Sequence, residues 1–219
     1  MSIHLKDGKI LDCSHKTHIP DESKIESCTF DKDLKYILVL EKGTIFNYLE
    51  RLEFHDTKKY IIMTSNCSPD ISSRRFLKWL QREIKLPVIG VADADPSGLK
   101  IMRYYSQGYV SLVQKNFNLS VSSLMWVVIS LFGIEELRIE LNEYNSKKLT
   151  EKYVKILDNL LTNKYTTPRW KAAVEKMRDV DRKASFEIMN KKGCRYVADC
   201  LLPKLINRAM GIKEQAISQ

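Results

Sequence analysis

The stretch YILVLEKGTIFNYL, residues 36–49, sets the pattern from which the fold can be predicted. Apolar residues run without a break from Tyr36 to Leu40 and stop at Glu41, which is typical of a parallel strand covered on both faces. A helix is expected next, with Thr44 as its cap. Its apolar residues at helical spacing are Ile45, Tyr48, Leu49 and Leu52.

The same strand–helix pattern occurs twice more along the chain. Residues 60–64 (YIIMT) and 87–92 (PVIGVA) predict buried strands, and helices are expected over 71–84 and from about 96 to 106. Residues 110–113 are a candidate for one more strand. This alternation predicts an α/β fold with a parallel sheet that helices flank on both faces.

The composition divides the chain into three expected parts. Residues 1–35 are polar and rich in turn formers, so an arm or a junction to another domain is expected there. Residues 36–135 form the α/β domain, and residues 136–219 form a helical C-terminal extension of the same unit. In that extension, helices are expected around 149–160, from Pro168 to near Gly193, and over 197–210 with an interruption at Pro203.

Three carboxylates follow predicted strands. Glu41 ends one strand, and Asp93 and Asp95 end another. Carboxyl ends of parallel strands share one edge of a sheet, so these side chains are expected at that edge. Hard oxygen donors of this kind suit Mg²⁺. The alternative is an Asx-type turn in DADPSG that caps the next helix, with Pro96 at its first position.

Three segments resemble one known family. ILVLEKGTIFNYL (37–49), SPDISSRRFLKWL (68–80) and LPVIGVADADPSGLKIM (86–102) are similar to motifs of the A subunit of archaeal topoisomerase VI and of the eukaryotic meiotic double-strand-break protein. In these proteins the segments belong to a Toprim domain. Looser similarity extends the resemblance over roughly residues 8 to 210.

The resemblance implies a role in breaking double-stranded DNA by tyrosine transesterification. Glu41, Asp93 and Asp95 would hold Mg²⁺, and Glu41 would also assist catalysis as an acid–base group. The family's nucleophilic tyrosine lies in a winged-helix domain far upstream. Tyr36 is the only tyrosine before Glu41 and falls inside a strand, so we expect no nucleophile here and an inactive chain by itself.

The basic residues agree with a polyanionic partner, although a basic surface kept for solubility is the alternative. The formal net charge is +9, and each Lys or Arg placed against a phosphate releases counterions. Lys42, Arg74 and Arg75 lie in the resembling motifs and are expected to contact DNA. Lys147 and Lys148 are expected to be ordinary surface charge.

The sequence departs from the family pattern at two places that the resemblance would put near DNA. The glycine- and lysine-containing loop of the family is Ser65-Asn66-Cys67-Ser68 here, and the tyrosine that usually follows DADP is Ser97. Two other functions therefore stay open: a metal-dependent Toprim nuclease that needs no tyrosine, and a non-catalytic scaffold that binds DNA or protein.

The resemblance also implies partners and a location. A homodimer is implied, because the family cuts two strands with two subunits, and an ATPase B-type subunit is a further partner. The location would be the nucleus in a eukaryote and the cytoplasm in an archaeon. The longest apolar run, residues 121–134, is too short to cross a bilayer, and no targeting segment is visible, so no membrane is expected.

Overall fold

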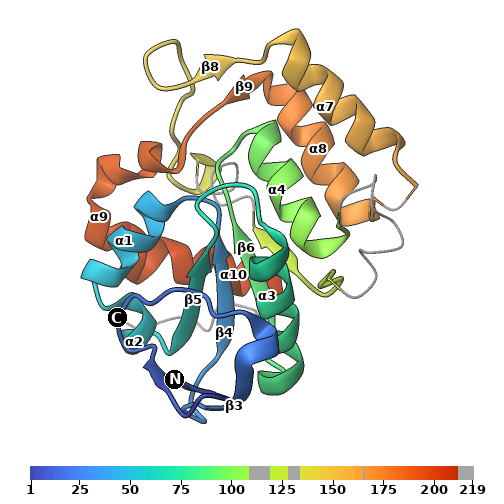
Figure 1. The fold of residues 1–219 in the computed structure, drawn as a ribbon. Helices are drawn as coiled ribbons and strands as arrows, with labels where there is room; N and C mark the ends of the chain where they lie inside the picture. Colours follow the sequence, from blue (N-terminus) through green and yellow to red (C-terminus); the bar gives the residue numbers. More distant parts are fainter. Residues whose placement is uncertain (109–118, 128–133, 165, 212–219) are drawn as a thin grey trace. The chain divides into compact units, whose positions relative to one another are not determined.

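The computed structural model describes residues 1–108, 119–127, 134–164 and 166–211 (Figure 1). The chain forms two compact units. The first comprises Met1–Gly90 and Arg103–Met125, and the second comprises Val91–Met102 and Trp126–Gln219. The domain limits expected from the composition stay a prediction.

A four-stranded sheet with the order β5-β4-β6-β7 confirms the predicted α/β class. Its strands are β4 (Tyr36–Leu40), β5 (Tyr60–Thr64), β6 (Val88–Val91) and β7 (Met125–Val127). β4 and β5 are parallel and pair in register from Tyr36↔Tyr60 to Leu40↔Thr64. The last four residues of β4 are fully buried, as an uninterrupted apolar run requires. The strand expected at 110–113 lies outside the described residues.

The three predicted helices are present as α1 (Gly43–Arg51), α3 (Ile71–Ile84) and α4 (Pro96–Ser106), and the short α2 (Phe54–Thr57), which was not predicted, follows α1. The expected Thr44 cap is wrong, because α1 begins at Gly43 and its N-cap is Lys42, two residues before Thr44. α3 has the predicted bounds. Asp70 caps it by accepting a 2.7 Å hydrogen bond from the Ser73 amide, and Lys85 ends it in the left-handed conformation.

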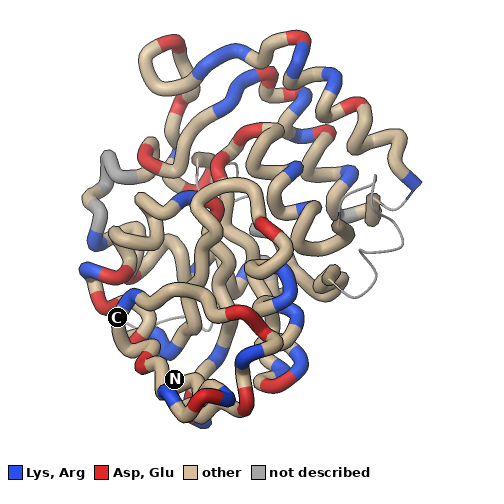
Figure 2. The backbone as a smooth tube through the Cα atoms, in the orientation of Figure 1, with Lys and Arg blue, Asp and Glu red and all other residues tan. Residues whose placement is uncertain are grey.

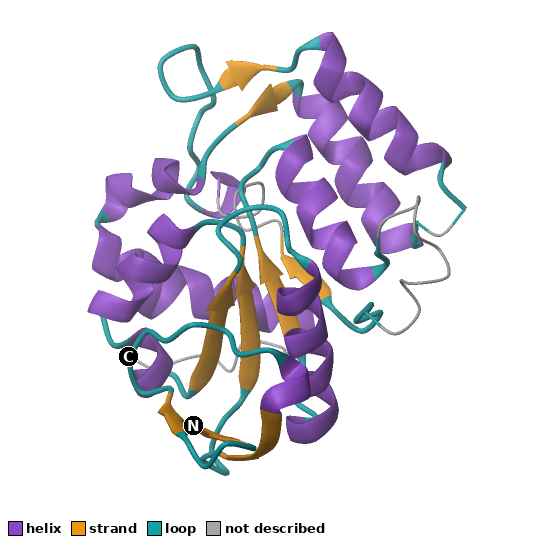
Figure 3. Cartoon of the chain, in the orientation of Figure 1, coloured by secondary structure: helices purple, strands orange, loops and turns teal. Residues whose placement is uncertain are grey.

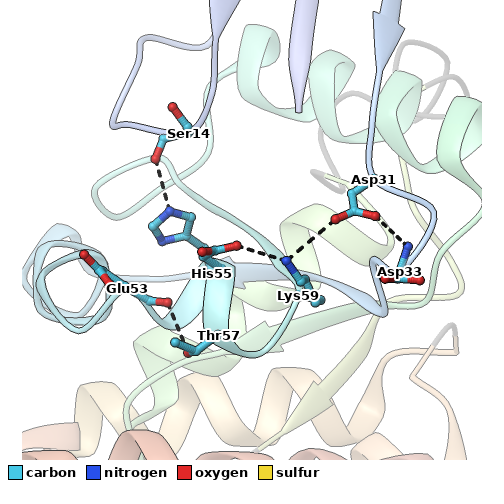
Figure 4. A network of polar contacts seen from close by, with 8 residues as sticks. Ser14, Asp31, Asp33, Glu53, His55, Thr57 and Lys59 are labelled. Atoms are coloured by element: carbon cyan, nitrogen blue, oxygen red, sulfur yellow. Dashed lines mark hydrogen bonds and ion pairs between the residues drawn. The ribbon is translucent and has the colours of Figure 1, made fainter.

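The N-terminal residues form a small antiparallel sheet with the order β2-β1-β3. Its strands are β1 (Ser2–Leu5), β2 (Ile10–Asp12) and β3 (Ile25–Thr29), and the 3-10 helix η1 (Glu22–Lys24) precedes β3. Polar contacts tie this part of the chain to α2 and to the start of β5 (Figure 4). Lys59 Nζ donates to Asp56 Oδ1 at 3.0 Å and lies 3.7 Å from Asp31 Oδ2. His55 Nε2 lies 3.1 Å from the Ser14 carbonyl oxygen.

The described part of the second unit is largely helical and also contains a strand pair (Figure 3). α7 (Glu151–Thr162) packs against α8 (Pro168–Val180), and the two-stranded ribbon of β8 (Lys147–Lys148) and β9 (Arg182–Lys183) lies at their ends. The helix expected to end near Gly193 ends at Val180, where Asp181 turns into the left-handed conformation with φ 50°.

The remaining segments of the second unit are short helical turns and one longer helix. They are η3 (Phe186–Lys192), α9 (Cys194–Tyr196), the π-helical turn η4 (Val197–Leu201) and α10 (Leu202–Met210). Pro203 lies in the first turn of α10, where its missing N–H costs no helical hydrogen bond. The expected interruption is therefore the start of a helix. In the described ranges no helix has both the length and the apolar character needed to span a membrane.

Candidate functional site

Asp93 lies at the start of the loop that joins β6 to α4, in the second unit. Its side chain is 5% exposed, and Asp93 Oδ1 accepts a 2.9 Å hydrogen bond from the Phe186 amide. The next residue, Ala94, exchanges both backbone hydrogen bonds with Ala184, at 3.0 and 3.1 Å. A segment about ninety residues further along the chain therefore orients the first aspartate of the DADPSG loop.

Asp95 caps α4. Its Oδ1 accepts a 2.6 Å hydrogen bond from the Gly98 amide, its carbonyl accepts one from Leu99 at 3.2 Å, and Pro96 opens the helix. The capping interpretation considered for this loop is thus correct for Asp95. It leaves the metal interpretation open, because a carboxylate has two oxygens and only Oδ1 takes part in the cap.

Lys183 and Tyr153 also lie beside this loop. Lys183 Nζ donates to the Tyr153 hydroxyl at 2.9 Å and lies 4.3 Å from the centre of its ring. The hydrogen bond from the ammonium group lowers the pKa of Tyr153, and a hydrogen bond with the Ser97 side chain acts in the same direction. The charge of Asp95 opposes the shift. A basic and a phenolic group therefore adjoin the two aspartates.

Lys183, Tyr153 and the role of Phe186 were not predicted from the sequence. Their roles depend on the pairing of Ala94 with Ala184 and on a two-residue strand, neither of which leaves a periodic pattern. Ser97 stood out only as a departure from the family's tyrosine. In this structure the side chain of Ser97 is hydrogen-bonded to Tyr153, a tyrosine of α7.

Glu41 and Lys42 lie in the first unit, directly after β4. Glu41 is a buried carboxylate with 6% exposure, and Lys42 is half-buried at the N-cap of α1. Gly43 follows, and a Cβ atom there would meet the Asn66 side-chain oxygen at 2.0 Å, so a larger residue would displace the Asn66 side chain. The turn after Glu41 is therefore packed closely against the loop that follows β5.

The two arginines of α3 have different surroundings. Arg74 is 1% exposed, while Arg75 is exposed and its positive charge helps to lower the pKa of Asp21. The main causes of that shift are hydrogen bonds from Ser23. Of the expected arginine pair, only Arg75 has a side chain at the surface of the first unit.

The loop Ser65–Ser68, which departs from the family pattern in sequence, has two non-glycine residues with positive φ. Asn66 and Cys67 have φ values of 54° and 122°, a region that favours glycine. The Ser65 hydroxyl accepts a 2.9 Å hydrogen bond from the Tyr105 hydroxyl, which anchors one end of the loop within the first unit.

The donor chemistry of the second unit fits a hard divalent cation. Asp93 and Asp95 are separated by one residue, and a backbone amide fixes one oxygen of each, as is typical of orienting contacts around metal ligands. A group of three His, Cys, Asp or Glu side chains gathered as a metal cage is not found in the part of the chain that the structure describes. A metal at this loop would therefore need further oxygen ligands from water or a phosphate.

Comparisons with known proteins identify the family to which this fold belongs. The model of the Toprim domain shared by Spo11 and the A subunit of topoisomerase 6 matches residues 36–206. Meiotic recombination protein SPO11-4 of Oryza sativa subsp. japonica is 34% identical over 210 residues, covering 94% of this chain and 42% of that protein. The A subunit of type 2 DNA topoisomerase 6 from Hyperthermus butylicus is 30% identical over 212 residues, covering 91% of this chain and 54% of that protein.

A third relative is the A subunit of DNA topoisomerase 6 from Arabidopsis thaliana, which is 26% identical over 203 residues, covering 90% of this chain and 47% of that protein. The chain spans about half the length of the curated relatives it matches. Since the family model matches most of the chain, this protein belongs to the family of Spo11 and the topoisomerase 6 A subunits and contains its Toprim domain.

Proposed function

We propose that this chain is the Mg²⁺-binding Toprim part of a protein that breaks double-stranded DNA by tyrosine transesterification. The observation that carries the proposal is the loop from Asp93 to Ser97. Its two carboxylates are held by the amides of Phe186 and Gly98, which fixes both side chains before any ligand arrives. Pre-oriented oxygen donors lose little conformational entropy on binding a cation.

Asp93 and Asp95 would be metal ligands in the second unit. A bound Mg²⁺ would stabilise the negative charge that develops on a phosphodiester under attack. Glu41 keeps the role that the ILVLEK motif gives it, as a further carboxylate ligand and an acid–base group. Its side chain is only 6% exposed, which restricts the positions that its carboxylate can take.

Double-stranded DNA is the proposed substrate, and Arg75 is the proposed backbone contact on α3. Its exposed guanidinium can reach a phosphate, whereas the buried Arg74 would act by orienting the start of the helix. Lys42, half-buried at the N-cap of α1, is proposed as a second phosphate contact.

Three further components are proposed to lie outside this chain: the nucleophilic tyrosine, the second copy and the B-type ATPase subunit. The matched relatives are about twice its length, which leaves room in them for a tyrosine-bearing domain. We therefore propose that the chain alone does not cleave DNA and acts in a homodimer. The similarity to plant and archaeal proteins supports a nuclear location in a eukaryote or a cytoplasmic one in an archaeon.

A scaffold that binds DNA or protein without catalysis is the second candidate. The loop Ser65–Ser68 favours it, because serine, asparagine and cysteine stand where the resembling family has a glycine- and lysine-containing loop. The scaffold predicts that DNA binding is the same with Mg²⁺ and with a chelator. A metal-dependent nuclease would instead nick DNA without any added domain.

Calorimetric titration with Mg²⁺ or Mn²⁺ tests the proposal. Wild-type chain is expected to bind the ion, and the variant Asp93→Asn/Asp95→Asn is expected to lose binding. Asp31→Asn/Asp33→Asn is the matched control, because this pair has the same one-residue spacing but lies in a loop of the first unit. Glu41→Gln tests the third carboxylate separately. Unchanged binding in the Asp93/Asp95 variant, or no binding even with duplex DNA present, would contradict the proposal.

A further inference from the structure

We propose that the ribbon β8–β9 is a phosphate-binding arm of the second unit that holds the backbone of double-stranded DNA beside the Asp93–Ser97 loop. The arm consists of Lys147, Lys148, Arg182 and Lys183, here called the basic ribbon. The inference rests on the proposed function in one respect, the use of the adjoining aspartates, and it adds the residues that would hold the substrate there.

Every residue of the basic ribbon is a cation. Lys147 pairs with Lys183 and Lys148 pairs with Arg182 in antiparallel register. Figure 2 shows basic residues on both strands of this ribbon. Like charges directly opposite one another destabilise a strand pair, so this ribbon is less stable alone than with an anion bound.

The described residues neutralise the basic ribbon only in part. Lys148 lies 3.5 Å from the Asp181 carboxylate, while Arg182 Nε donates to the neutral Ser146 hydroxyl at 2.7 Å. Lys183 Nζ donates to the neutral Tyr153 hydroxyl. Within the described ranges, Lys147, Arg182 and Lys183 form no ion pair with a carboxylate. The ribbon therefore presents a surplus of positive charge that an external polyanion can balance.

Backbone pairing places the basic ribbon next to the aspartates. β9 continues directly into Ala184, which pairs with Ala94. The bridge is isolated, so Lys183 and Asp95 are not themselves paired, but each is the immediate chain neighbour of a bridged alanine and they flank the bridge on the same side. Tyr153 strengthens this link because it is hydrogen-bonded both to Lys183 and to Ser97.

The kinds of donor favour a nucleic-acid backbone. Lysine, arginine, tyrosine and serine side chains are the groups that commonly contact DNA phosphates. A phosphate held by Lys183 would also lie beside Asp95, where a cation bridging carboxylate and phosphate oxygens relieves their repulsion. Lys183 is thus a direct phosphate contact, and Tyr153 is its positioning residue because the Tyr153 hydroxyl holds the ammonium group in place.

The test is the binding of a fluorescein-labelled DNA duplex, followed by anisotropy in EDTA from about 50 to about 200 mM salt. EDTA removes any metal, so the measurement reports the basic ribbon separately from the proposed metal site. Lys147→Ala/Lys183→Met is expected to weaken binding and to lower the slope of log affinity against log salt by about 2, since each phosphate contact contributes roughly 0.9. Lys183→Arg is expected to retain the slope.

Two controls make the test specific. Lys9→Ala/Lys24→Ala removes the same charge from the first unit and is expected to leave the slope unchanged. Tyr153→Phe retains every charge and is expected to weaken binding at an unchanged slope. If Lys147→Ala/Lys183→Met fails to fold, the exposed single variant Lys147→Glu takes its place and is expected to lower affinity further than Lys147→Ala.

Two results would overturn the inference. One is an equal loss of slope in the ribbon variant and in Lys9→Ala/Lys24→Ala. The other is that a poly-glutamate peptide of matched charge binds as tightly as DNA and that the ribbon variant loses this binding. That result would mean that the basic ribbon binds an acidic protein. Failure of the proposed metal site would appear instead as absent Mg²⁺ binding in calorimetry, with the EDTA-resistant DNA binding intact.

Discussion

The loop Ser65–Ser68 after β5 and the loop Asp93–Ser97 after β6 both join a buried strand to a helix, yet different forces hold them. The first places two non-glycine residues, Asn66 and Cys67, in backbone conformations that favour glycine. The second has only ordinary φ values, and the segment Ala184–Phe186 and its own helix cap fix it.

The difference supports the proposal that the Asp93–Ser97 loop is the metal site. A hydrogen-bonded carboxylate loop is stiff in the absence of a ligand, which suits ligand positions that must not move. The Ser65–Ser68 loop instead has local backbone strain, with a cost of order 1–3 kcal/mol for a residue so placed. Mutations that remove the hydrogen bonds of one loop, or the strain of the other, test this contrast.

The largest stability effect is expected at Asp93. Asp93→Ala deprives the buried Phe186 amide of its acceptor and should lower the free energy of unfolding by roughly 1–3 kcal/mol. Asp93→Asn keeps an acceptor oxygen and should lower it by less than half as much. Urea denaturation measures both variants. Equal losses would mean that the Phe186 amide does not depend on this carboxylate.

The strand before the Ser65–Ser68 loop should make the stability sensitive to alkali. Burial, with a smaller effect of Tyr36, raises the pKa of Tyr60 to about 12. The folded state therefore keeps the Tyr60 proton where the unfolded state, with a pKa of 10.0, loses it. This contribution is fully present below pH 10 and is lost between pH 10 and about 12, at roughly 1.4 kcal/mol per pH unit.

Tyr60→Phe isolates that contribution. The difference in unfolding free energy between wild type and Tyr60→Phe should be constant below pH 10 and should shift in favour of the variant at higher pH. Chemical denaturation across this range provides the measurement. A difference that stays constant up to pH 12 would contradict the buried, protonated state of Tyr60.

The helix cap at Asp95 should contribute less than the Asp93 hydrogen bond. Asp95→Ala removes the acceptor of the Gly98 amide and should cost about 1 kcal/mol. Asp95→Ser, which can also cap a helix, should recover most of it while removing a metal ligand. A thermal denaturation series that shows no recovery would mean that the cap is not what Asp95 contributes to stability.

The smallest effect, and one of opposite sign, is expected at Cys67. Cys67→Gly relieves the backbone conformation at φ 122° and should stabilise the first unit by about 0.5–1 kcal/mol, since the greater freedom of glycine in the unfolded chain offsets part of the gain. Cys67→Ala keeps a Cβ atom and is expected to give no gain. If both substitutions have the same effect, the loop is not strained at this residue.

Many helices and strands of the first unit could be predicted from the sequence, because the residue pattern of each one lies within a short stretch of the chain. The aliphatic run of β4 and the helical spacing of α3 both appear within a short window, and the bounds of α3 agree with the prediction. The positions of Asp93 and Asp95 after a strand were predictable for the same reason. The start of α1 was misplaced, because a short helix without a side-chain cap carries little signal at its first residue.

The rest depends on contacts between distant parts of the chain. The pairing of Ala94 with Ala184 has no sequence pattern, so the neighbours of the aspartates could not be foreseen. β8 and β9 have two residues each, too few for any alternation to show. In the sequence Lys147 cannot be told from ordinary surface charge, although its pairing with Lys183 is what gives the ribbon its proposed role.

The location of a bound ion would decide whether the Asp93–Ser97 loop is a metal site. Crystals soaked in Mn²⁺, with and without a DNA duplex, would reveal the ion in an anomalous difference map. We expect a peak within about 2.2 Å of carboxylate oxygens of Asp93 and Asp95, together with water or phosphate oxygens. A map from the DNA complex with no peak at these side chains, or with its only peak elsewhere, would contradict a metal-binding Toprim site in this protein.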